Sequence, residues 1–559
     1  MKRLSFHELA QMAARLFALV LISAIVAINS TCADASESAT AQRPSNILFA
    51  FADDLGKYAS AYRDPDRPSP NDIISTPVFD RVAREGALFH NAFVSAPSCT
   101  PSRAAIVSGR HFFRNGSHSQ LHHPWMQGYT DPFDDVRGFP LMLQSQSFHI
   151  GWTYKMHIFE DRMGGSERNY RSAGSQFNGF SARVTKAKDA AVEKARLLEE
   201  VRQNFRSFLA DRQDDQPFYY WFNPTNTHRP WARGSGKSIW GLDPDQLRGK
   251  LPKFLPDNEV VREDFADYLG EAMAFDAAVG VLIEELERIG ELDNTLVVIS
   301  GDHGAPGFPR GKCNLYDFGT QVLLAARMPG KIVAGREIDK PVSLIDLAST
   351  YLEVAGLAAT EDMNGQSLWS AMTSGEEDYE QDLRGFAITG RETHVDVARE
   401  AGYPYPMRGI RTKDHLYVIN FKPERWPVAV PPLAAPLQRL SDMRQDSNGD
   451  LVRRTDIDFG PTRDYFFSHE DDPQLAPLWQ LGLGLRPAEE LYVVASDPDQ
   501  MQNRADDPEL ADVKAQLREQ LMDELKRNGD PRVVGTGDGF DRAPYRKPVP
   551  PDTGLPVEP

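Results

Sequence analysis

A cysteine and an arginine lie four residues apart in the stretch "SAPSCTPSRAAIVSGR", residues 95–110. Pro101 suits a first helical turn and Ser108-Gly109 suits a helix end, so we expect a helix to begin near Cys99. The free backbone N–H groups at such a helix start favour anions, and Arg103 falls on the same face one turn later. A lone cysteine is more often a small buried residue, but this neighbourhood also suits chemistry on an anion.

Two residue pairs, each containing aspartate, follow short apolar runs and have side chains that can ligate a metal. Asp53-Asp54 follows residues 46–51, and Asp302-His303 follows residues 295–300. Each pair alone reads as an ordinary turn before a glycine. Together they can supply oxygen ligands to one divalent cation. His303 fits calcium less well than an oxygen ligand would, so its imidazole either binds calcium through one nitrogen or shifts the site toward another metal.

Basic and imidazole side chains follow two further apolar runs. Lys155 and His157 come after residues 149–154, and His228, in "NPTNTHRP", comes after residues 217–222. All four runs have the length and the β-branched and aromatic content of strands, and helical patterns lie between them. This alternation predicts an α/β fold with a large, mostly parallel sheet sandwiched by helices. Ligands of such folds bind beyond the carboxyl ends of the strands, where these polar residues fall.

The pattern of expected secondary structure changes after about residue 380. "MRGIRTKDHLYVINF" and "ELYVVASDPDQ" read as antiparallel strands, and "LADVKAQLREQLMDELKRN" reads as a terminal amphipathic helix. We therefore expect a catalytic domain over residues 45–380 and a smaller C-terminal α+β subdomain with an antiparallel sheet over residues 381–530. The region 423–472 is rich in proline and charge and reads as a long excursion, and residues 531–559 read as a disordered Pro-rich tail.

The N-terminus has the pattern of an export signal. Basic residues precede the 13-residue apolar run "LFALVLISAIVAI", and a small-residue site follows at 33–35, which predicts a signal peptide over residues 1–35. The alternative is an uncleaved anchor; after cleavage we expect no integral membrane segment. Only Cys99 and Cys313 would remain, and a single disulfide between them is formally allowed. So few cysteines in an exported chain favour a bacterial periplasm, or secretion, as its location.

The overall charge excludes one class of partner. The chain has 62 Lys and Arg against 80 Asp and Glu, a net charge of −18. Such a balance argues against nonspecific binding to nucleic acid. It leaves an anionic substrate open, because a local basic pocket can sit on an acidic surface.

The stretch Cys99-Thr100-Pro101-Ser102-Arg103 resembles the sulfatase signature Cys-x-Pro-Ser-Arg. The resemblance runs from about Ser45 to about Asn503 and implies an alkaline-phosphatase-like fold. It also implies oxidation of Cys99 to formylglycine (3-oxoalanine) by a formylglycine-generating or anaerobic sulfatase-maturating enzyme. A geminal diol made from that aldehyde would be the nucleophile. The implied metal site holds one Ca²⁺ through Asp53, Asp54, modified Cys99, Asp302 and His303, with His303 standing where the family usually has Asn.

Other family motifs imply roles for further residues. Lys155 and His157 match a Gly-Lys-x-His motif in which Tyr154 replaces the glycine, and His228 and Lys312 match later active-site positions. In the implied mechanism the cation and the basic side chains neutralise the sulfate. His228 protonates the leaving atom, with Lys155 as a second candidate for this step, and His157 takes a proton from the diol. The implied catalytic set is Cys99, Arg103, Lys155, His157, His228 and Lys312.

Two longer segments, "FPRGKCNLYDFGTQVLLAARMPG" and "YPMRGIRTKDHLYVINF", resemble the heparan N-sulfatases (sulfamidases). This favours a sulfated glycan as substrate and leaves O-sulfate ester and N-sulfo groups both open. Contacts to the sugar are expected from His122, His123, Arg310 and His394, for which a role as solvated loop residues is about equally plausible. Two other functions stay open: a phosphodiesterase or phosphonate monoester hydrolase of the same superfamily, and an inactive glycan-binding homologue.

Overall fold

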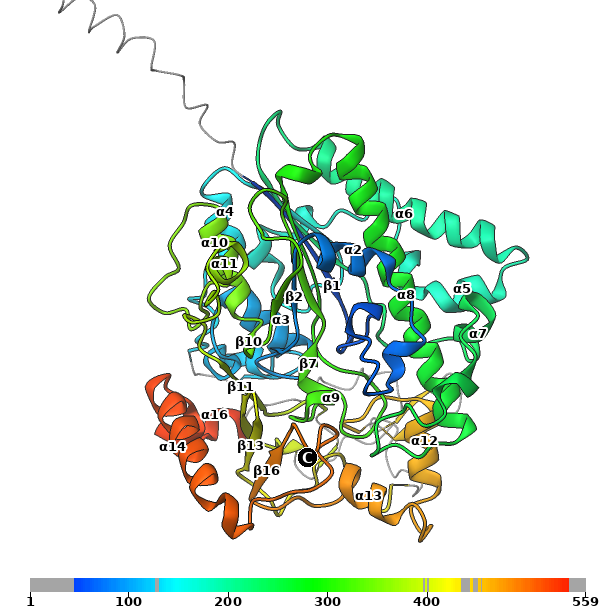
Figure 1. Ribbon diagram of the computed structural model, residues 1–559, viewed down its shortest axis with the longest axis vertical. Coiled ribbons are helices and arrows are strands. Elements are labelled where there is room, and N and C mark those ends of the chain that lie inside the picture. Colours follow the sequence, from blue (N-terminus) through cyan, green and yellow to red (C-terminus); the bar gives the residue numbers. More distant parts are fainter. Residues whose placement is uncertain are drawn as a thin grey trace, which may run out of the picture. The chain divides into compact units, whose positions relative to one another are not determined.

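A large twisted sheet forms the centre of the computed structural model (Figure 1). The structure describes residues 45–125, 130–395, 398–399, 402–433, 443–445, 451–453 and 455–541, so the predicted signal peptide over 1–35 lies outside it. The strand order in this sheet is β4-β5-β1-β6-β8-β2-β9. Its strands are β1 (Asn46–Ala52), β2 (Ala87–Phe89), β4 (His149–Tyr154), β5 (Phe218–Asn223), β6 (Thr295–Gly301), β8 (Leu324–Arg327) and β9 (Arg336–Ile338).

The neighbouring strands β4, β5, β1 and β6 are parallel, with Leu48 of β1 opposite both Tyr220 of β5 and Val297 of β6. Strand β8 runs antiparallel to β6 and to β2, and β9 is parallel to β2. The predicted mostly parallel sheet is therefore confirmed. The short strands β3 (Ala92–Phe93), β7 (Gln321–Val322) and β10 (Val342–Ser343) form a small sheet beside it.

Both faces of the large sheet are covered by helices, because the side chains of β1 alternate between two apolar cores. Leu48 and Ala50 belong to the core beneath α6 and α8, whereas Ile47 and Phe49 belong to the core beneath α4 and α10. Figure 1 shows these helix groups on opposite sides of the sheet. The helices of this region are α2 (Pro77–Glu85), α3 (Cys99–Ser108), α4 (Phe139–Gln144), α5 (Phe180–Lys186), α6 (Ala190–Ala210), α7 (Ser235–Trp240), α8 (Glu259–Arg288), α9 (Asp317–Thr320), α10 (Asp346–Val354) and α11 (Trp369–Thr373).

An antiparallel sheet follows, as the sequence predicted, in the order β11-β12-β13-β16. Its apolar face packs against α14, where Leu517, Leu521 and Leu525 join one core with Ile410 and Tyr417. The elements of this region are β11 (Phe386–Arg391), β12 (Met407–Thr412), β13 (His415–Asn420), β14 (Met443–Gln445), β15 (Leu451–Arg453), β16 (Glu489–Val493), α12 (Pro461–Ser468), α13 (Ala476–Leu483), α14 (Ala511–Arg527), α15 (Pro531–Val534) and α16 (Asp538–Asp541). The chain from Ser45 onward groups into one compact unit, so a domain boundary near residue 380 stays a prediction.

The start of the predicted disordered tail is ordered. Helices α15 and α16 lie within residues 531–541, and Arg532 forms ion pairs with Glu392, which follows β11, and with Asp541. Asp530, just before α15, pairs with the fully buried Arg408 at 2.5 Å. These buried ion pairs hold the segment against the C-terminal sheet, which corrects the expected tail for residues 531–541; residues 542–559 lie outside the described part.

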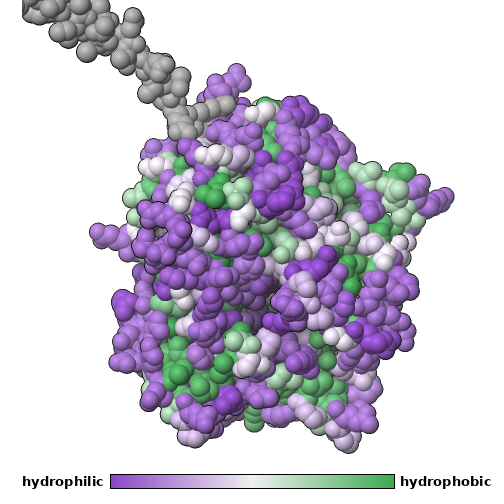
Figure 2. Space-filling model, viewed as in Figure 1, coloured by the Kyte–Doolittle hydropathy of each residue, from purple (hydrophilic) through white to green (hydrophobic). Residues whose placement is uncertain are grey.

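The molecular surface drawn in Figure 2 is mostly hydrophilic, with hydrophobic patches scattered between polar ones. Among the helices of the described residues, none combines the length and the apolar character needed to cross a membrane.

Candidate active site

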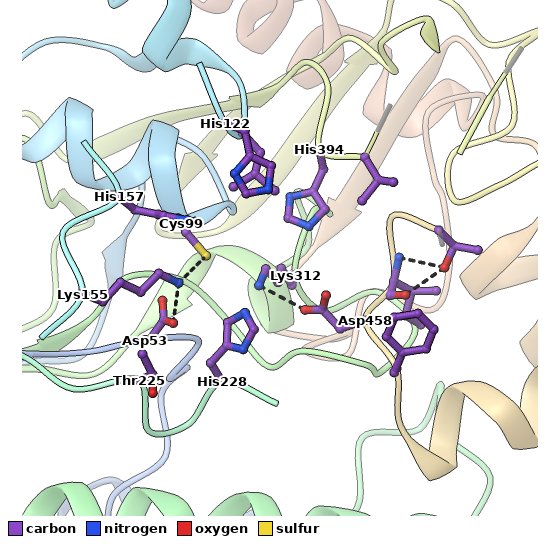
Figure 3. Close-up of a pocket in the computed structure, with 15 residues that line it drawn as sticks. Asp53, Cys99, His122, Lys155, His157, Thr225, His228, Lys312, His394 and Asp458 are labelled. Atoms are coloured by element: carbon purple, nitrogen blue, oxygen red, sulfur yellow. Dashed lines mark hydrogen bonds and ion pairs between the residues drawn. The ribbon is translucent and has the colours of Figure 1, made fainter. Parts of the chain in front are cut away.

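Polar side chains gather at the carboxyl ends of the parallel strands. Asp53-Asp54 follows β1, Lys155 follows β4, and Asp302-His303 follows β6, while the loop containing His228 leaves β5. Because these strands are neighbours in the sheet, their ends meet at one edge (Figure 3). The predicted convergence of these residues is therefore present in the structure.

Cys99 begins α3 and lies at the bottom of this cluster, 1% exposed. Its Sγ is 3.3 Å from Lys155 Nζ and 3.5 Å from His303 Nε2. Burial raises the pKa of the thiol well above its ordinary value, and the opposing effect of Lys155 and Lys312 is smaller. The unmodified side chain is therefore a neutral thiol at physiological pH rather than a thiolate nucleophile. It is also a free cysteine, as is Cys313, so the formally allowed disulfide is not formed.

Arg103 lies behind the cluster and is fully buried. Its guanidinium donates to Asp302 Oδ2 at 3.0 Å, to Asp53 Oδ1 at 3.2 Å and to Asn223 Oδ1 at 2.8 Å. This three-way contact fixes the ends of β1, β5 and β6 relative to α3. In this structure Arg103 holds the acidic side chains in place and does not line the pocket.

Two lysines pair with the acids from the pocket side. Lys155 Nζ lies 2.5 Å from Asp53 Oδ2, and Lys312 Nζ lies 3.0 Å from Asp54 Oδ2. Burial by itself would raise the pKa of Asp53, but Lys155 and its basic neighbours lower it well below its ordinary value. Burial would likewise lower the pKa of Lys312, yet its acidic partners raise it well above the usual range. Both lysines are therefore charged and face the space above Cys99.

A group of buried ligand atoms fits a divalent cation. One ligand atom each of Asp54, Cys99, Asp302 and His303 lies within 4.8 Å of the others, and a second such group joins Asp53, Asp54, Cys99 and His228. His303 Nδ1 is 3.1 Å from Gly304 O, which leaves Nε2 facing Asp54 Oδ1, 3.1 Å away. An imidazole nitrogen and carboxylate oxygens gathered within so short a distance can serve as ligands of one cation.

A pocket of about 370 Å³ opens above this cluster. Of the residues predicted from the sequence, Asp53, Cys99, Lys155, His157, His228, Lys312, His122 and His394 line it; Asp54, Asp302 and His303 lie beneath its floor. The backbone around it is strained: Asp54, His122, Tyr154 and His157 all have φ between 59° and 74°. Tyr154 thus adopts, with a side chain, the left-handed conformation that suits a glycine, the residue expected at this motif position.

Three of the four histidines that line the pocket have distinct surroundings. His228 Nδ1 lies 2.6 Å from Arg229 O, so Nδ1 donates and Nε2 faces the pocket, 4.0 Å from Asp54 Oδ2. Burial and then Lys155 lower the pKa of His157 far below its ordinary value. Burial and then Lys312 do the same for His394, whose Nδ1 hydrogen-bonds Ser98 Oγ at 2.9 Å. His157 and His394 are therefore neutral in this structure.

Two predicted sugar contacts lie outside the pocket lining. Arg310 is 1% exposed, donates to Gln500 O at 2.6 Å, and stacks 3.4 Å from the ring centre of Tyr316. Its proximity to Lys312 in sequence does not bring it to the pocket, because its side chain packs against the C-terminal region. His123 contacts His157 O at 3.2 Å and stacks on His118, so it supports the loop behind the pocket wall. Neither residue is among the described residues that line the pocket, and their contact with the sugar stays a prediction.

The outer wall of the pocket includes residues that the sequence analysis missed. Thr455, Ile457, Asp458 and Phe459 line it, and all come from the Pro-rich region read only as an excursion. The Asp458 carboxylate pairs with Lys312 at 3.0 Å (Figure 3). The sequence signal for this segment is weak: an acidic "TDIDFG" stretch with no periodicity and no local partner.

Comparison with known proteins identifies the family. The model of the family described as Sulfatase matches residues 45–357, more than half of the chain. The chain belongs to the sulfatase family. It is accordingly a hydrolase of the sulfuric ester class, and the resemblance seen in the sequence is confirmed.

Relatives with known activities cover most of its length. Human N-sulphoglucosamine sulphohydrolase is 28% identical over 532 residues, which cover 88% of this chain and 92% of that protein. An ulvan-active sulfatase of Formosa agariphila is 25% identical, covering 89% of this chain and 77% of its own.

Solved structures show the same fold at lower identity. BT4656 in complex with its substrate D-glucosamine-2-N,6-O-disulfate has a TM-score of 0.54 at 17% identity, covering 88% of this chain and 99% of that one. The phosphonate monoester hydrolase of Silicibacter pomeroyi has a TM-score of 0.56 at 16% identity, covering 88% and 97%. These matches confirm the predicted architecture of a large α/β sheet with a C-terminal antiparallel sheet.

Proposed function

We propose that this sulfatase hydrolyses sulfate groups, as O-sulfate esters or N-sulfo groups, from a sulfated glycan. The observation that carries the proposal is the position of Cys99, at the start of α3 and 3.3 Å from Lys155, on the floor of a pocket lined by Lys155 and Lys312. The similarity of most of the chain to N-sulphoglucosamine sulphohydrolase and to an ulvan-active sulfatase supports a carbohydrate substrate.

The nucleophile is formylglycine made from Cys99. The raised pKa of the buried thiol disfavours a thiolate mechanism, which supports a role for this cysteine as the precursor of the modified residue. When hydrated, the aldehyde supplies a geminal diol that can attack sulfur and later expel sulfate by restoring its carbonyl, which no unmodified side chain can do. A formylglycine-generating or anaerobic sulfatase-maturating enzyme is the partner that installs it.

One divalent cation, calcium, completes the site. The carboxylates of Asp53, Asp54 and Asp302, the imidazole of His303 and modified Cys99 would hold it, and the bound cation would stabilise negative charge on the sulfate and the nucleophile. Arg103, Lys155 and Lys312 already balance the three carboxylates in charge. An added divalent cation therefore gives the site the positive charge that an anionic substrate needs.

The remaining residues move protons and bind sulfate oxygens. Lys155 and Lys312 face the space above Cys99 and are placed to hold the sulfate group, while Arg103 keeps the acids beneath them in register. His228 presents Nε2 to the pocket and protonates the leaving oxygen or nitrogen. His157 lines the pocket and accepts the proton of the second hydroxyl.

We place the enzyme outside the cytoplasm, in a bacterial periplasm or secreted, on the basis of the predicted signal peptide over residues 1–35. The low cysteine content agrees with that placement, and the net charge of −18 argues against a nucleic acid partner.

The test is activity of the matured protein. We expect enzyme produced with a maturation enzyme to hydrolyse an aryl sulfate and sulfated saccharides faster than aryl phosphate diesters or phosphonate monoesters. Its intact mass should fall by roughly 18 Da on conversion of the thiol to the aldehyde. Cys99→Ala should bind sulfated ligands without turnover, whereas the matched variant Cys313→Ala, which removes the other buried thiol, should keep the mass change and the activity.

A preference for phosphonate or phosphodiester substrates would instead support the phosphonate hydrolase alternative, which shares the fold. Binding without turnover in the matured protein would support the glycan-binding alternative. Full turnover by a preparation that carries only the thiol at Cys99 would contradict the proposed nucleophile.

A further inference from the structure

The charges of the pocket are distributed asymmetrically. Among its described lining residues, the cations other than histidine are Lys155 and Lys312, and both contact the acids beside Cys99. The outer wall has neutral side chains, Leu121, Val395 and Phe459 among them, together with one carboxylate, Asp458. The positive charge is thus confined to the place of the scissile sulfate, and the wall beyond it carries a negative charge.

Asp458 is held firmly in this wall. Its Oδ2 lies 3.0 Å from Lys312 Nζ, and Lys312 lies between Asp458 and Cys99 in Figure 3. Burial would raise the pKa of Asp458, but Lys312, and after it His228 and His394, lower it well below the ordinary range. The side chain is 19% exposed, so the carboxylate is charged and still reachable from the pocket.

The chain on either side of Asp458 fixes its position. The preceding Asp456 forms ion pairs with Arg391 and Arg399, both buried. After Asp458 the chain enters α12, whose Thr462 donates to Asp264 through its backbone N–H and its hydroxyl. A carboxylate anchored on both sides has little freedom to swing away from a ligand that repels it.

A fixed carboxylate next to a sulfate site discriminates between the groups that neighbour the sulfate on the sugar. A hydroxyl or an ammonium group can donate a hydrogen bond to it, whereas a second sulfate or a carboxylate meets a like charge. Such a like-charge contact is costly, and like-charge contacts of this kind are a common source of specificity.

We propose, resting on the proposed sulfatase function, that Asp458 restricts the substrate to a sugar residue with a single negative group in the pocket. The preferred substrate carries hydroxyl or ammonium donors beside the scissile sulfate. Sugar residues that carry a second sulfate or a uronate carboxylate beside the scissile sulfate are rejected.

The test is binding, so that it does not depend on turnover. In the Cys99→Ala background with calcium, calorimetry compares glucosamine N-sulfate with the disulfate that carries a second sulfate on the neighbouring O3, glucosamine-2-N,3-O-disulfate. We expect the disulfate to bind at least about tenfold more weakly, a difference of about 1.4 kcal/mol. Adding Asp458→Asn, which keeps the shape and removes the charge, should bring this ratio close to unity, chiefly by improving binding of the disulfate.

The matched control is Asp471→Asn, which removes the same charge from an exposed side chain of the same region and should leave the ratio unchanged. Equal affinity for both ligands before Asp458 is changed would overturn the inference. So would an equal loss for both ligands in Asp458→Asn, since that result assigns Asp458 only to the positioning of Lys312. Hydrolysis of an aryl sulfate by the matured enzyme tests the sulfatase function separately, so failure of one is distinguishable from failure of the other.

Discussion

The carboxylate of Asp456 lies 2.5 Å from Arg399 Nη1, and neither side chain is more than 3% exposed. The same carboxylate pairs with Arg391 and accepts a hydrogen bond from Val395 N at 2.8 Å. Asp456 thereby ties the strand end and loop that carry His394 to the segment that carries Asp458. Two pocket walls that lie far apart in the sequence are joined by one buried acid.

Asp456→Asn should therefore loosen both walls at once. The change leaves two buried arginines without their carboxylate, and breaking a buried pair in this way costs about 3–5 kcal/mol. We expect a lower thermal midpoint and a higher KM for a sulfated saccharide, with a smaller change in turnover of an aryl sulfate, which has no sugar to contact the walls. Thermal unfolding and kinetics on both substrates check this. Asp471→Asn is the charge-matched control, and an equal kinetic loss on both substrates would argue against a role confined to the walls.

Removal of the cation should affect both stability and activity. Asp302→Asn removes one of the carboxylates beneath Cys99 and should lower the calcium content of the purified protein and nearly abolish activity. Chelation of the wild-type protein should lower its thermal midpoint, because a ligand that binds only the folded state stabilises it. Elemental analysis and thermal unfolding with and without added calcium measure these effects. A chelated preparation that keeps its thermal midpoint and its activity would refute the proposed cation site.

His394 has two features that can be tested separately, its hydrogen bond to Ser98 and its position in the pocket lining. Its Nδ1 is bonded to Ser98, the residue before Cys99, and its ring lines the pocket. We expect His394→Ala to lower kcat/KM on the natural glycan strongly, on the order of 10–100-fold, and to matter far less on an aryl sulfate. Ser98→Ala removes the hydrogen bond but keeps the imidazole, so it should have the smaller effect on the glycan. Equal losses on both substrates for His394→Ala would place this histidine in the catalytic or structural set.

The part of the site that follows the strands could be predicted from the sequence, because each strand end is local. Asp53-Asp54, Lys155 and Asp302-His303 needed only the correct strands and their parallel order. The outer wall could not be predicted in this way. Asp458 reaches the pocket only because buried ion pairs such as Asp456–Arg399 fold a long segment back onto it, and no periodicity in the sequence encodes those pairs.

The position of Arg310 and the order of residues 531–541 depart from the sequence-based expectations for the same physical reason. Arg310 is adjacent in sequence to the pocket but packs against Tyr316 and Gln500, so local sequence distance misplaced it. Residues 531–541 have the composition of a tail but are held by Arg532 and its partners Glu392 and Asp541. In both cases a long-range contact of an arginine determines where the side chain or segment lies, and such contacts depend on the tertiary fold.

His111, which follows the helix of Cys99, makes stability depend on pH. Its ring is 2% exposed and stacks on Phe113. Burial, and after it Arg384 and Arg114, lower its pKa from 6.5 to about 3. Between these values the unfolded chain binds a proton that the folded protein does not, so the free energy of unfolding falls as the pH falls below 6.5.

His111→Phe should remove this contribution while keeping an aromatic ring beside Phe113. The free energy of unfolding of the variant, relative to wild type, should then rise by about 2 kcal/mol between pH 7 and pH 5, at about 1.4 kcal/mol for each pH unit below 6.5. Thermal unfolding at several pH values measures the difference. His469→Phe changes an exposed histidine at the end of α12 and should leave the pH dependence as in wild type. Parallel pH curves for His111→Phe and wild type would show that His111 is not the group that makes acid destabilise the fold.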